Sequence, residues 1–290
     1  MPELPEVETI VRTLAPQIIG RAVTSVCPLY PKVLQSGLEL LPLLEAGAGG
    51  CLAVSRVFRR AKLLLFLLAP VSPSAVCGAE AELLMIFHLK MTGGLFLHAA
   101  GSVPLKHTRL IADFSDGCRL FFDDMRTFGY CRIMRHAALD SWPFWASLGP
   151  EPLGMSPRDL AAHFVHVFAG RTVSIKAALL DQRTVAGIGN IYADESLFHA
   201  GIHPRAHVSD LGMERLDALT EALQRVLRRA IRERGSSIRN YRDAYGQAGA
   251  FQNSFAVYGR KGQPCVSCRR PLAGARIAGR GTVYCPFCQQ

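Results

Sequence analysis

The chain has 290 residues, of which 49% are hydrophobic, and its formal net charge is +10 at pH 7 with an isoelectric point of about 9.4. This length is enough for two or three domains with hydrophobic cores, and the excess of Lys and Arg favours an anionic partner, either a nucleic acid or a membrane surface. The longest apolar run, residues 63–69, is much shorter than the roughly 20 residues that cross a bilayer. We expect no signal peptide, because the first residues are acidic rather than basic.

Residues 2–6 have the sequence Pro-Glu-Leu-Pro-Glu. We expect removal of Met1, which a small second residue permits, and the chain then begins with the secondary amine of Pro2 beside the carboxylate of Glu3. An α-amino group has a pKa of about 7.7–8.0, so part of it is an unprotonated nucleophile at neutral pH. Attack of this secondary amine on a sugar C1′ gives an iminium cation, which favours later elimination reactions. Pro and Glu open many chains, so this interpretation depends on the other motifs.

Apolar residues at helical spacing predict a helix from about Pro5, which Pro16 kinks or ends and Gly20 closes. From residue 21 to about 135, short apolar runs alternate with Gly, Pro, Ser and Asp, which predicts a β-sandwich or barrel. The expected strands are 23–26, 51–58, 63–68, 83–89, 95–97, 109–114, 119–122 and 130–134. Two segments, 31–50 and 70–80, are interpreted as loops or hairpin insertions.

Four side chains of this region are candidates for contacts with a nucleic acid. Lys62 follows two arginines at the start of a strand, which indicates either a phosphate contact or a solvated strand edge. Met91 and Phe128 lie in Gly-containing turns, where they either fold back into the core or act as wedges that unstack a duplex. In the second case, Arg126 beside Phe128 is placed to bind the base left behind.

The second half of the chain is predicted to be helical. Residues 137–155, which hold both tryptophans and several prolines, are interpreted as a linker, and helices are expected at about 159–169, 174–182, 190–200 and 211–234. A Gly-rich turn separates the second helix from the third, with Asn190 expected at the N-cap. Such a turn is either a plain helical hairpin or a DNA-binding motif, because its amides and the following helix N-terminus bind phosphate. Residues 245–255 are interpreted as a mobile loop.

The C-terminal tail carries two Cys-x-x-Cys pairs separated by sixteen residues, a spacing typical of a closed structural zinc site. The expected ligands are Cys265, Cys268, Cys285 and Cys288. From residue 258 onward there are six Lys or Arg and neither Asp nor Glu, so the predicted zinc hairpin is basic. Arg280, between two glycines at its tip, is the best candidate for insertion between phosphates. The scattered remaining cysteines favour a reducing compartment.

Four separated motifs occur in the order found in one enzyme family. They are residues 2–9, Pro-Glu-Leu-Pro-Glu-Val-Glu-Thr; 60–62, Arg-Ala-Lys; 187–195, Gly-Ile-Gly-Asn-Ile-Tyr-Ala-Asp-Glu; and 258–262, Tyr-Gly-Arg-Lys-Gly. On these motifs the whole chain resembles the formamidopyrimidine-DNA glycosylase family, also called 8-oxoguanine DNA glycosylase/AP lyase.

The resemblance implies a two-domain α+β fold. Its parts are an N-terminal β-sandwich flanked by helices and a C-terminal helical domain with a helix-two-turn-helix motif and a β-hairpin zinc finger with four cysteine ligands. The expected boundaries are 2–136 for the catalytic domain, 137–155 for the linker, 156–257 for the helical domain and 258–290 for the finger.

By the same resemblance, the chain is a bifunctional base-excision-repair enzyme that flips and removes oxidised purines, 8-oxoguanine and formamidopyrimidines. Pro2 forms a Schiff base with the sugar, Glu3 is the general acid/base, Lys62 is the third residue implied to be catalytic, and β,δ-elimination nicks the strand. The implied contacts around the flipped nucleotide are Lys62, His88, Lys176, Asn190, Tyr258 and Arg280, and the implied gap-filling residues are Met91, Arg126 and Phe128. The resemblance also implies one structural zinc ion and, as the partner, double-stranded DNA that carries a lesion or an abasic site. It further implies a monomer in the bacterial cytoplasm, associated with the nucleoid.

The chain departs from the family pattern in two places. Thr127 stands where the second Arg of a Pro-Arg-Arg-Phe-Gly motif is usual, and residues 70–82 look longer than usual. Two alternatives remain open. An endonuclease VIII-type enzyme for oxidised pyrimidines usually opens Pro-Glu-Gly-Pro-Glu, so Leu4 favours the purine branch. A zinc-finger DNA-binding protein without catalysis is the other alternative.

Overall fold

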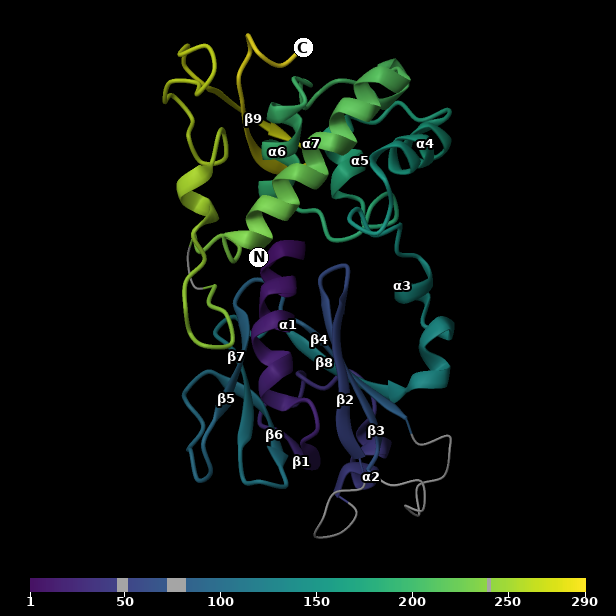
Figure 1. The fold of residues 1–290 in the computed structure, drawn as a ribbon, viewed down its shortest axis with the longest axis vertical. Helices are drawn as coiled ribbons and strands as arrows, with labels where there is room; N and C mark the ends of the chain where they lie inside the picture. The colour runs from purple at the N-terminus through teal and green to yellow at the C-terminus, as the bar shows by residue number, and fades with distance from the viewer. Residues whose placement is uncertain (46–51, 72–81, 239–240) are drawn as a thin grey trace. The chain divides into compact units, whose positions relative to one another are not determined.

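The computed structural model describes residues 1–45, 52–71, 82–238 and 241–290 (Figure 1). They form two compact units: Met1–Ala146 with Arg234–Gly249, and Ser147–Glu233 with Ala250–Gln290. The first unit is therefore discontinuous, and it includes a segment that the sequence analysis placed in the helical domain. No helix in the described part of the chain is both long and apolar enough to span a membrane.

The first unit is built on one eight-stranded sheet in the order β5-β7-β6-β1-β2-β3-β4-β8. Phe87 of β4 and Phe122 of β7 pack at 5.4 Å between ring centroids, although four strands separate β4 from β7 in the sheet. The sheet must therefore fold over on itself, which confirms the predicted β-sandwich. The strands are β1 (Ala22–Pro28), β2 (Leu52–Arg60), β3 (Leu63–Pro70), β4 (Leu83–His88), β5 (Gly93–His98), β6 (Thr108–Phe114), β7 (Arg119–Asp124) and β8 (Tyr130–Arg135).

Helix α1 (Leu4–Ile18) packs on the sandwich through an apolar stripe that is completely or almost completely buried, including Val7, Ile10 and Leu14. The helix runs two residues past Pro16 and ends at Ile18, so the proline lies in its last turn. Gly20, at a φ of +87°, then reverses the chain into β1.

Two segments expected to be irregular contain short helices. In the predicted loop 31–50, residues Leu38–Leu40 form a 3-10 turn and Leu41–Glu45 form α2, because this leucine-rich stretch buries Leu44 in the core. In the predicted linker, His136–Ser141 form a 3-10 helix and Pro143–Ala146 form α3. The predictions for residues 46–51 and 72–81 lie outside the described residues.

The second unit is helical, as predicted. Ser156 accepts a hydrogen bond from the Asp159 N–H and caps the N-terminus of α4. The prediction for Asn190 is wrong: Gly189 is the N-cap of α6, and Asn190 is its first helical residue. The elements are α4 (Pro157–Phe168), α5 (Ile175–Leu180), α6 (Asn190–His199), α7 (Met213–Arg232), a 3-10 turn (Phe251–Ser254), β9 (Ala273–Ile277) and β10 (Arg280–Tyr284).

Candidate functional site

The N-terminal Pro-Glu pair lies at the buried start of α1. Pro2 is buried, and Glu3, at 3% exposure, is the N-cap residue of the helix. The Glu3 N–H donates to Oε2 of Glu6 at 2.8 Å, so a carboxylate one turn along the helix fixes the backbone beside Pro2. The pair is held in one orientation before any ligand binds.

The other carboxylate oxygen of Glu6 binds the segment that returns from the end of the chain. Oε1 accepts the Ser236 N–H at 2.8 Å and the Ser236 hydroxyl at 3.1 Å. The Tyr241 hydroxyl donates to the Glu6 carbonyl at 3.2 Å, and burial beside Glu6 raises the pKa of Tyr241. The segment Arg234–Gly249 is thereby attached to the start of α1.

Lys62 occupies the tight turn between β2 and β3, where Arg60 pairs with Leu63. Arg59 stabilises this turn by donating to the Ala61 carbonyl at 2.9 Å and by an ion pair of 3.2 Å with Glu8 of α1. Lys62 is only 7% exposed, so the turn is part of the packed structure rather than a solvated strand edge.

His88 ends β4, paired with Leu63 of β3. Burial lowers its pKa to about 3, and the nearby charges of Lys90 and Lys62 act in the same direction. Its Nδ1 accepts the Lys90 N–H at 3.0 Å, so the neutral ring carries its proton on Nε2. His88 is therefore an uncharged donor at neutral pH.

Met91 and Phe128 are 38% and 54% exposed, so neither folds back into the core. The Arg126 guanidinium lies over the Phe128 ring at 4.8 Å, which keeps two of the predicted gap-filling side chains together. A hydrogen bond joins the turn that carries Met91 to the turn that carries Phe128, because the Thr92 hydroxyl donates to the buried carboxylate of Asp124.

Asp124 also shapes the second turn directly. Its carboxylate accepts the N–H groups of Arg126 at 3.1 Å and Gly129 at 2.7 Å. Within the turn, Thr127 has a φ of +56°, a left-handed conformation that is strained for a β-branched residue. The residue that departs from the family pattern therefore occupies a strained backbone position.

In the second unit, the four predicted cysteines gather at one point, with their sulfurs all within 4.8 Å of one another. The Sγ atoms of Cys265 and Cys288 are 3.9 Å apart, and those of Cys268 and Cys285 are 3.5 Å apart. Four ligands at the Zn–S distance of about 2.3 Å in a tetrahedron are separated by about 3.8 Å, so these sulfurs fit one structural zinc ion. The ion would fix the ends of the β9–β10 hairpin.

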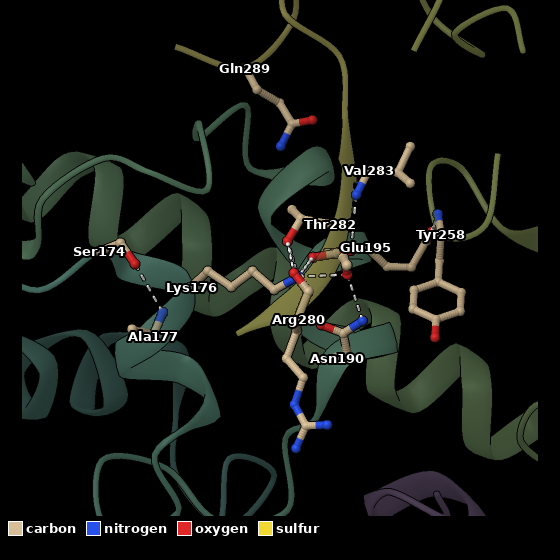
Figure 2. Close-up of polar contacts among 12 residues, drawn as sticks. Ser174, Lys176, Ala177, Asn190, Glu195, Tyr258, Arg280, Thr282, Val283 and Gln289 are labelled. Atoms are coloured by element: carbon tan, nitrogen blue, oxygen red, sulfur yellow. Dashed lines mark hydrogen bonds and ion pairs between the residues drawn. The ribbon is translucent and has the colours of Figure 1, made fainter. Parts of the chain in front are cut away.

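Arg280 begins β10 and is exposed, as expected of a phosphate contact. Lys176 is different: it is the second residue of α5, it is 0% exposed, and its Nζ donates to Asp194 Oδ1 at 2.5 Å and to Thr282 Oγ1 at 2.6 Å. Figure 2 shows its side chain reaching the hairpin while the Arg280 side chain points away from this cluster. A direct DNA contact for Lys176 does not fit this burial.

Asn190 and Tyr258 are held by the same helix. The Asn190 side-chain amide donates to the Gly281 carbonyl at 2.9 Å, and its Oδ1 has no hydrogen-bond partner among the described residues. Glu195, fully buried in α6, accepts the N–H of Tyr258 at 2.8 Å and those of the two preceding residues, Ala256 and Val257. Helix α6 thus anchors both the hairpin and the segment that leads into the finger.

Sequence reasoning missed the carboxylates that organise these sites. They are Glu6, Asp124, Asp194 and Glu195, and all four are buried. A weak signal was available for two of them, because Asp194 and Glu195 end the motif of residues 187–195.

These units define a DNA-binding protein that combines a β-sandwich, a helix-two-turn-helix motif and a four-cysteine zinc finger. Residues 1–131 match the formamidopyrimidine-DNA glycosylase N-terminal domain, 148–242 the H2TH domain of the same enzymes, and 262–290 a zinc finger found in FPG and IleRS. The chain belongs to the formamidopyrimidine-DNA glycosylase family.

Relatives and solved structures agree. The chain is 42% identical to a formamidopyrimidine-DNA glycosylase of Desulfitobacterium hafniense over all of both chains. It is 56% identical to one of Nitratidesulfovibrio vulgaris over 74% of this chain, and that match spans 58% of the relative. It is similar to wild-type Lactococcus lactis Fpg (MutM) in a complex with N7-benzyl-Fapy-dG DNA, at 32% identity, full coverage of both chains and a TM-score of 0.85. The MutM (Fpg) protein of Thermus thermophilus is 37% identical, with 99% and 98% coverage and a TM-score of 0.84.

Proposed function

We propose that this protein is a bifunctional DNA glycosylase/AP lyase that removes oxidised purines and then nicks the strand. The observation that carries this proposal is the buried Pro2-Glu3 pair, which Glu6 fixes at the start of α1 in a chain of this family. The proposed domains keep the predicted boundaries, except that residues 137–146 of the predicted linker and residues 234–249 belong to the first unit.

The proposed reaction begins with extrusion of the damaged base, since its sugar cannot be reached inside the duplex. The Pro2 nitrogen, once Met1 is removed, forms a bond to C1′ while the glycosidic bond breaks and the base leaves with a proton. Loss of the ring oxygen from C1′ gives the iminium, and Glu3 carries protons to and from the sugar. Two eliminations then release the phosphates on either side of the sugar.

The remaining roles divide between the two units. We assign phosphate contacts to Lys62, to the neutral His88 through its Nε2–H, and to Asn190, Tyr258 and Arg280. A neutral hydrogen-bond donor suits the position of His88, because Lys62 and Lys90 nearby already supply positive charge.

We assign three exposed side chains to filling the gap that the extruded base leaves in the duplex. Met91 and Phe128 act as wedges, and Arg126 faces the orphaned cytosine. The finger, held by one structural zinc ion, presents Arg280 to the backbone. We further propose that the protein acts as a monomer in the bacterial cytoplasm, on double-stranded DNA with oxidised bases or abasic sites.

Borohydride trapping tests this function. Wild type incubated with duplex carrying 8-oxoguanine opposite cytosine is expected to form a covalent adduct, and Pro2→Gly is expected to abolish it. Glu3→Gln tests the proton-transfer role by single-turnover kinetics. Faster excision of thymine glycol than of 8-oxoguanine would assign the chain to the pyrimidine enzymes, and absence of an adduct would leave a DNA-binding protein without this chemistry. Intact mass of the purified protein reports whether Met1 is removed.

A further inference from the structure

Lys176 lies too deep to touch DNA, yet it ends on the strand that carries Arg280. Besides Asp194 and Thr282, its Nζ donates to the Gly281 carbonyl at 3.4 Å. The Gly281 carbonyl also accepts the Asn190 amide at 2.9 Å. Two side chains from two helices, α5 and α6, therefore converge on the residue that follows Arg280; Figure 2 shows Lys176 and Asn190 beside Arg280.

The Asp194 carboxylate attaches to the same strand. While Oδ1 pairs with Lys176, Oδ2 accepts the Val283 N–H at 3.3 Å. Burial raises the pKa of Asp194 to about 6, with Lys176 acting in the opposite direction, so the carboxylate is largely ionised at neutral pH. The buried pair thus contacts three successive residues of β10, Gly281, Thr282 and Val283.

The last link leads to Arg280 itself. The Thr282 hydroxyl accepts from Lys176 and donates to the Arg280 carbonyl at 3.2 Å, so the lysine orients the hydroxyl that restrains this backbone. A buried ion pair stabilises a fold little more than well-packed apolar residues do, because its desolvation cost offsets its attraction. Its directional hydrogen bonds do, however, fix one position of the hairpin relative to the helices.

We propose that Lys176 and Asp194 form a positioning pair that acts through Thr282 to hold the Arg280 backbone where its guanidinium meets a DNA phosphate. This inference rests on the proposed role of Arg280. It replaces direct contact by Lys176 with an indirect effect on affinity, and it adds Asp194 and Thr282 to the residues that determine DNA binding.

Thr282→Val tests the proposal with little disturbance, because Val has a similar volume and the ion pair stays in place. Binding is measured on a duplex with a tetrahydrofuran abasic analogue, which the enzyme cannot cleave. We expect about tenfold weaker binding, the order expected for one lost hydrogen bond to a charged group. Thr282→Ser, which keeps the hydroxyl, is expected to restore most of the affinity. Zinc content and thermal unfolding of each variant show that the finger remains folded.

A double-mutant cycle with Arg280→Ala separates positioning from a general structural effect. If Thr282 acts through Arg280, then Thr282→Val is expected to weaken binding no further in the Arg280→Ala background. Additive losses, or wild-type affinity for Thr282→Val, would overturn the proposal. A wild type that binds DNA but forms no adduct would instead contradict the proposed enzymatic function, and the binding cycle would still decide the positioning role.

Discussion

Glu6 accepts two hydrogen bonds from Ser236, one from the backbone N–H at 2.8 Å and one from the hydroxyl at 3.1 Å. Its second oxygen accepts the N–H of Glu3, so one carboxylate joins the proposed catalytic terminus to a segment 230 residues away in the chain. All three donors therefore meet an acceptor oxygen of the Glu6 side chain.

Glu6→Gln is therefore expected to slow adduct formation. The amide places an NH2 group against an N–H donor, and an unsatisfied buried group costs about 1–3 kcal/mol, which corresponds to a rate loss of roughly 5- to 150-fold if the terminus loses its orientation. Single-turnover trapping at saturating protein measures this loss. Glu39→Gln, at an exposed position of the same unit, is the matched control, and equal rates for the two variants would contradict the role of Glu6.

Gly235 is expected to tolerate no side chain. It has a φ of +75°, and a Cβ atom there would lie 2.8 Å from Oε1 of Glu6. Gly246 has the same φ but open space around its Cβ position. Gly246→Ala should thus cost only backbone strain of about 1 kcal/mol, whereas Gly235→Ala should cost more in denaturant unfolding and should also slow trapping. Equal unfolding free energies for the two variants would show that the contact with Glu6 is unimportant.

The buried His88 predicts a pH dependence of stability. Its pKa is about 3 when folded and 6.5 in the reference state, so between these values the unfolded chain binds one more proton. The free energy of unfolding therefore falls as pH drops through this window, by up to about 1.4 kcal/mol per pH unit. His88→Gln should flatten this slope in urea titrations at pH 4 to 6.5, while His166→Gln, at an exposed site, should leave it unchanged.

Asp124→Asn is expected to loosen both wedge turns. The amide cannot accept the Thr92 hydroxyl and the N–H groups of Arg126 and Gly129 together without turning its NH2 group toward a donor. Discrimination between cytosine and adenine opposite the lesion should fall several-fold, because Arg126 and Phe128 lose their fixed backbone. Excision rates on the two duplexes measure this ratio. Asp140→Asn, at an exposed position, provides the control. An unchanged ratio of the two excision rates in Asp124→Asn would show that the Asp124 turn does not contribute to recognition of the opposite base.

Removal of zinc is expected to abolish DNA binding while the sandwich stays folded. The four thiolates hold the base of the β9–β10 hairpin, and none of the described cysteines of the first unit belongs to this cluster. Chelation followed by metal analysis, a binding assay and hydrogen exchange of the strand amides tests both parts. Unchanged affinity after complete metal loss, or loss of protection in β1 to β8, would contradict the expectation.

The periodicity of the sequence was sufficient for the main elements, because strands and helices with one buried face repeat their apolar residues regularly. The short helix α2 escaped this reasoning, since five residues are too few to show a helical period. The N-cap of α6 was assigned to the wrong residue, because Gly189 and Asn190 are both acceptable N-cap residues. The packing of the first helical turn decides between them.

The site was predictable only where a residue's role follows from its chemistry. Four cysteines at this spacing predict that they share one metal site. In contrast, the burial of Lys176 depends on Asp194 and on Thr282, which is 106 residues away in the chain. Likewise, nothing in the local sequence distinguishes Glu6 or Asp124 from an ordinary surface acid. Their burial arises from tertiary packing alone.

The discontinuity of the first unit has a consequence for biosynthesis. Ser236 leaves the ribosome only after the whole helical segment Ser147–Glu233 has been translated. At roughly 5–20 residues per second, the sandwich and α1 exist for several seconds before Glu6 meets its partner. A nascent chain stopped before residue 234 therefore lacks the Ser236 donors that bind Glu6, and the order of translation completes the surroundings of the proposed catalytic terminus last.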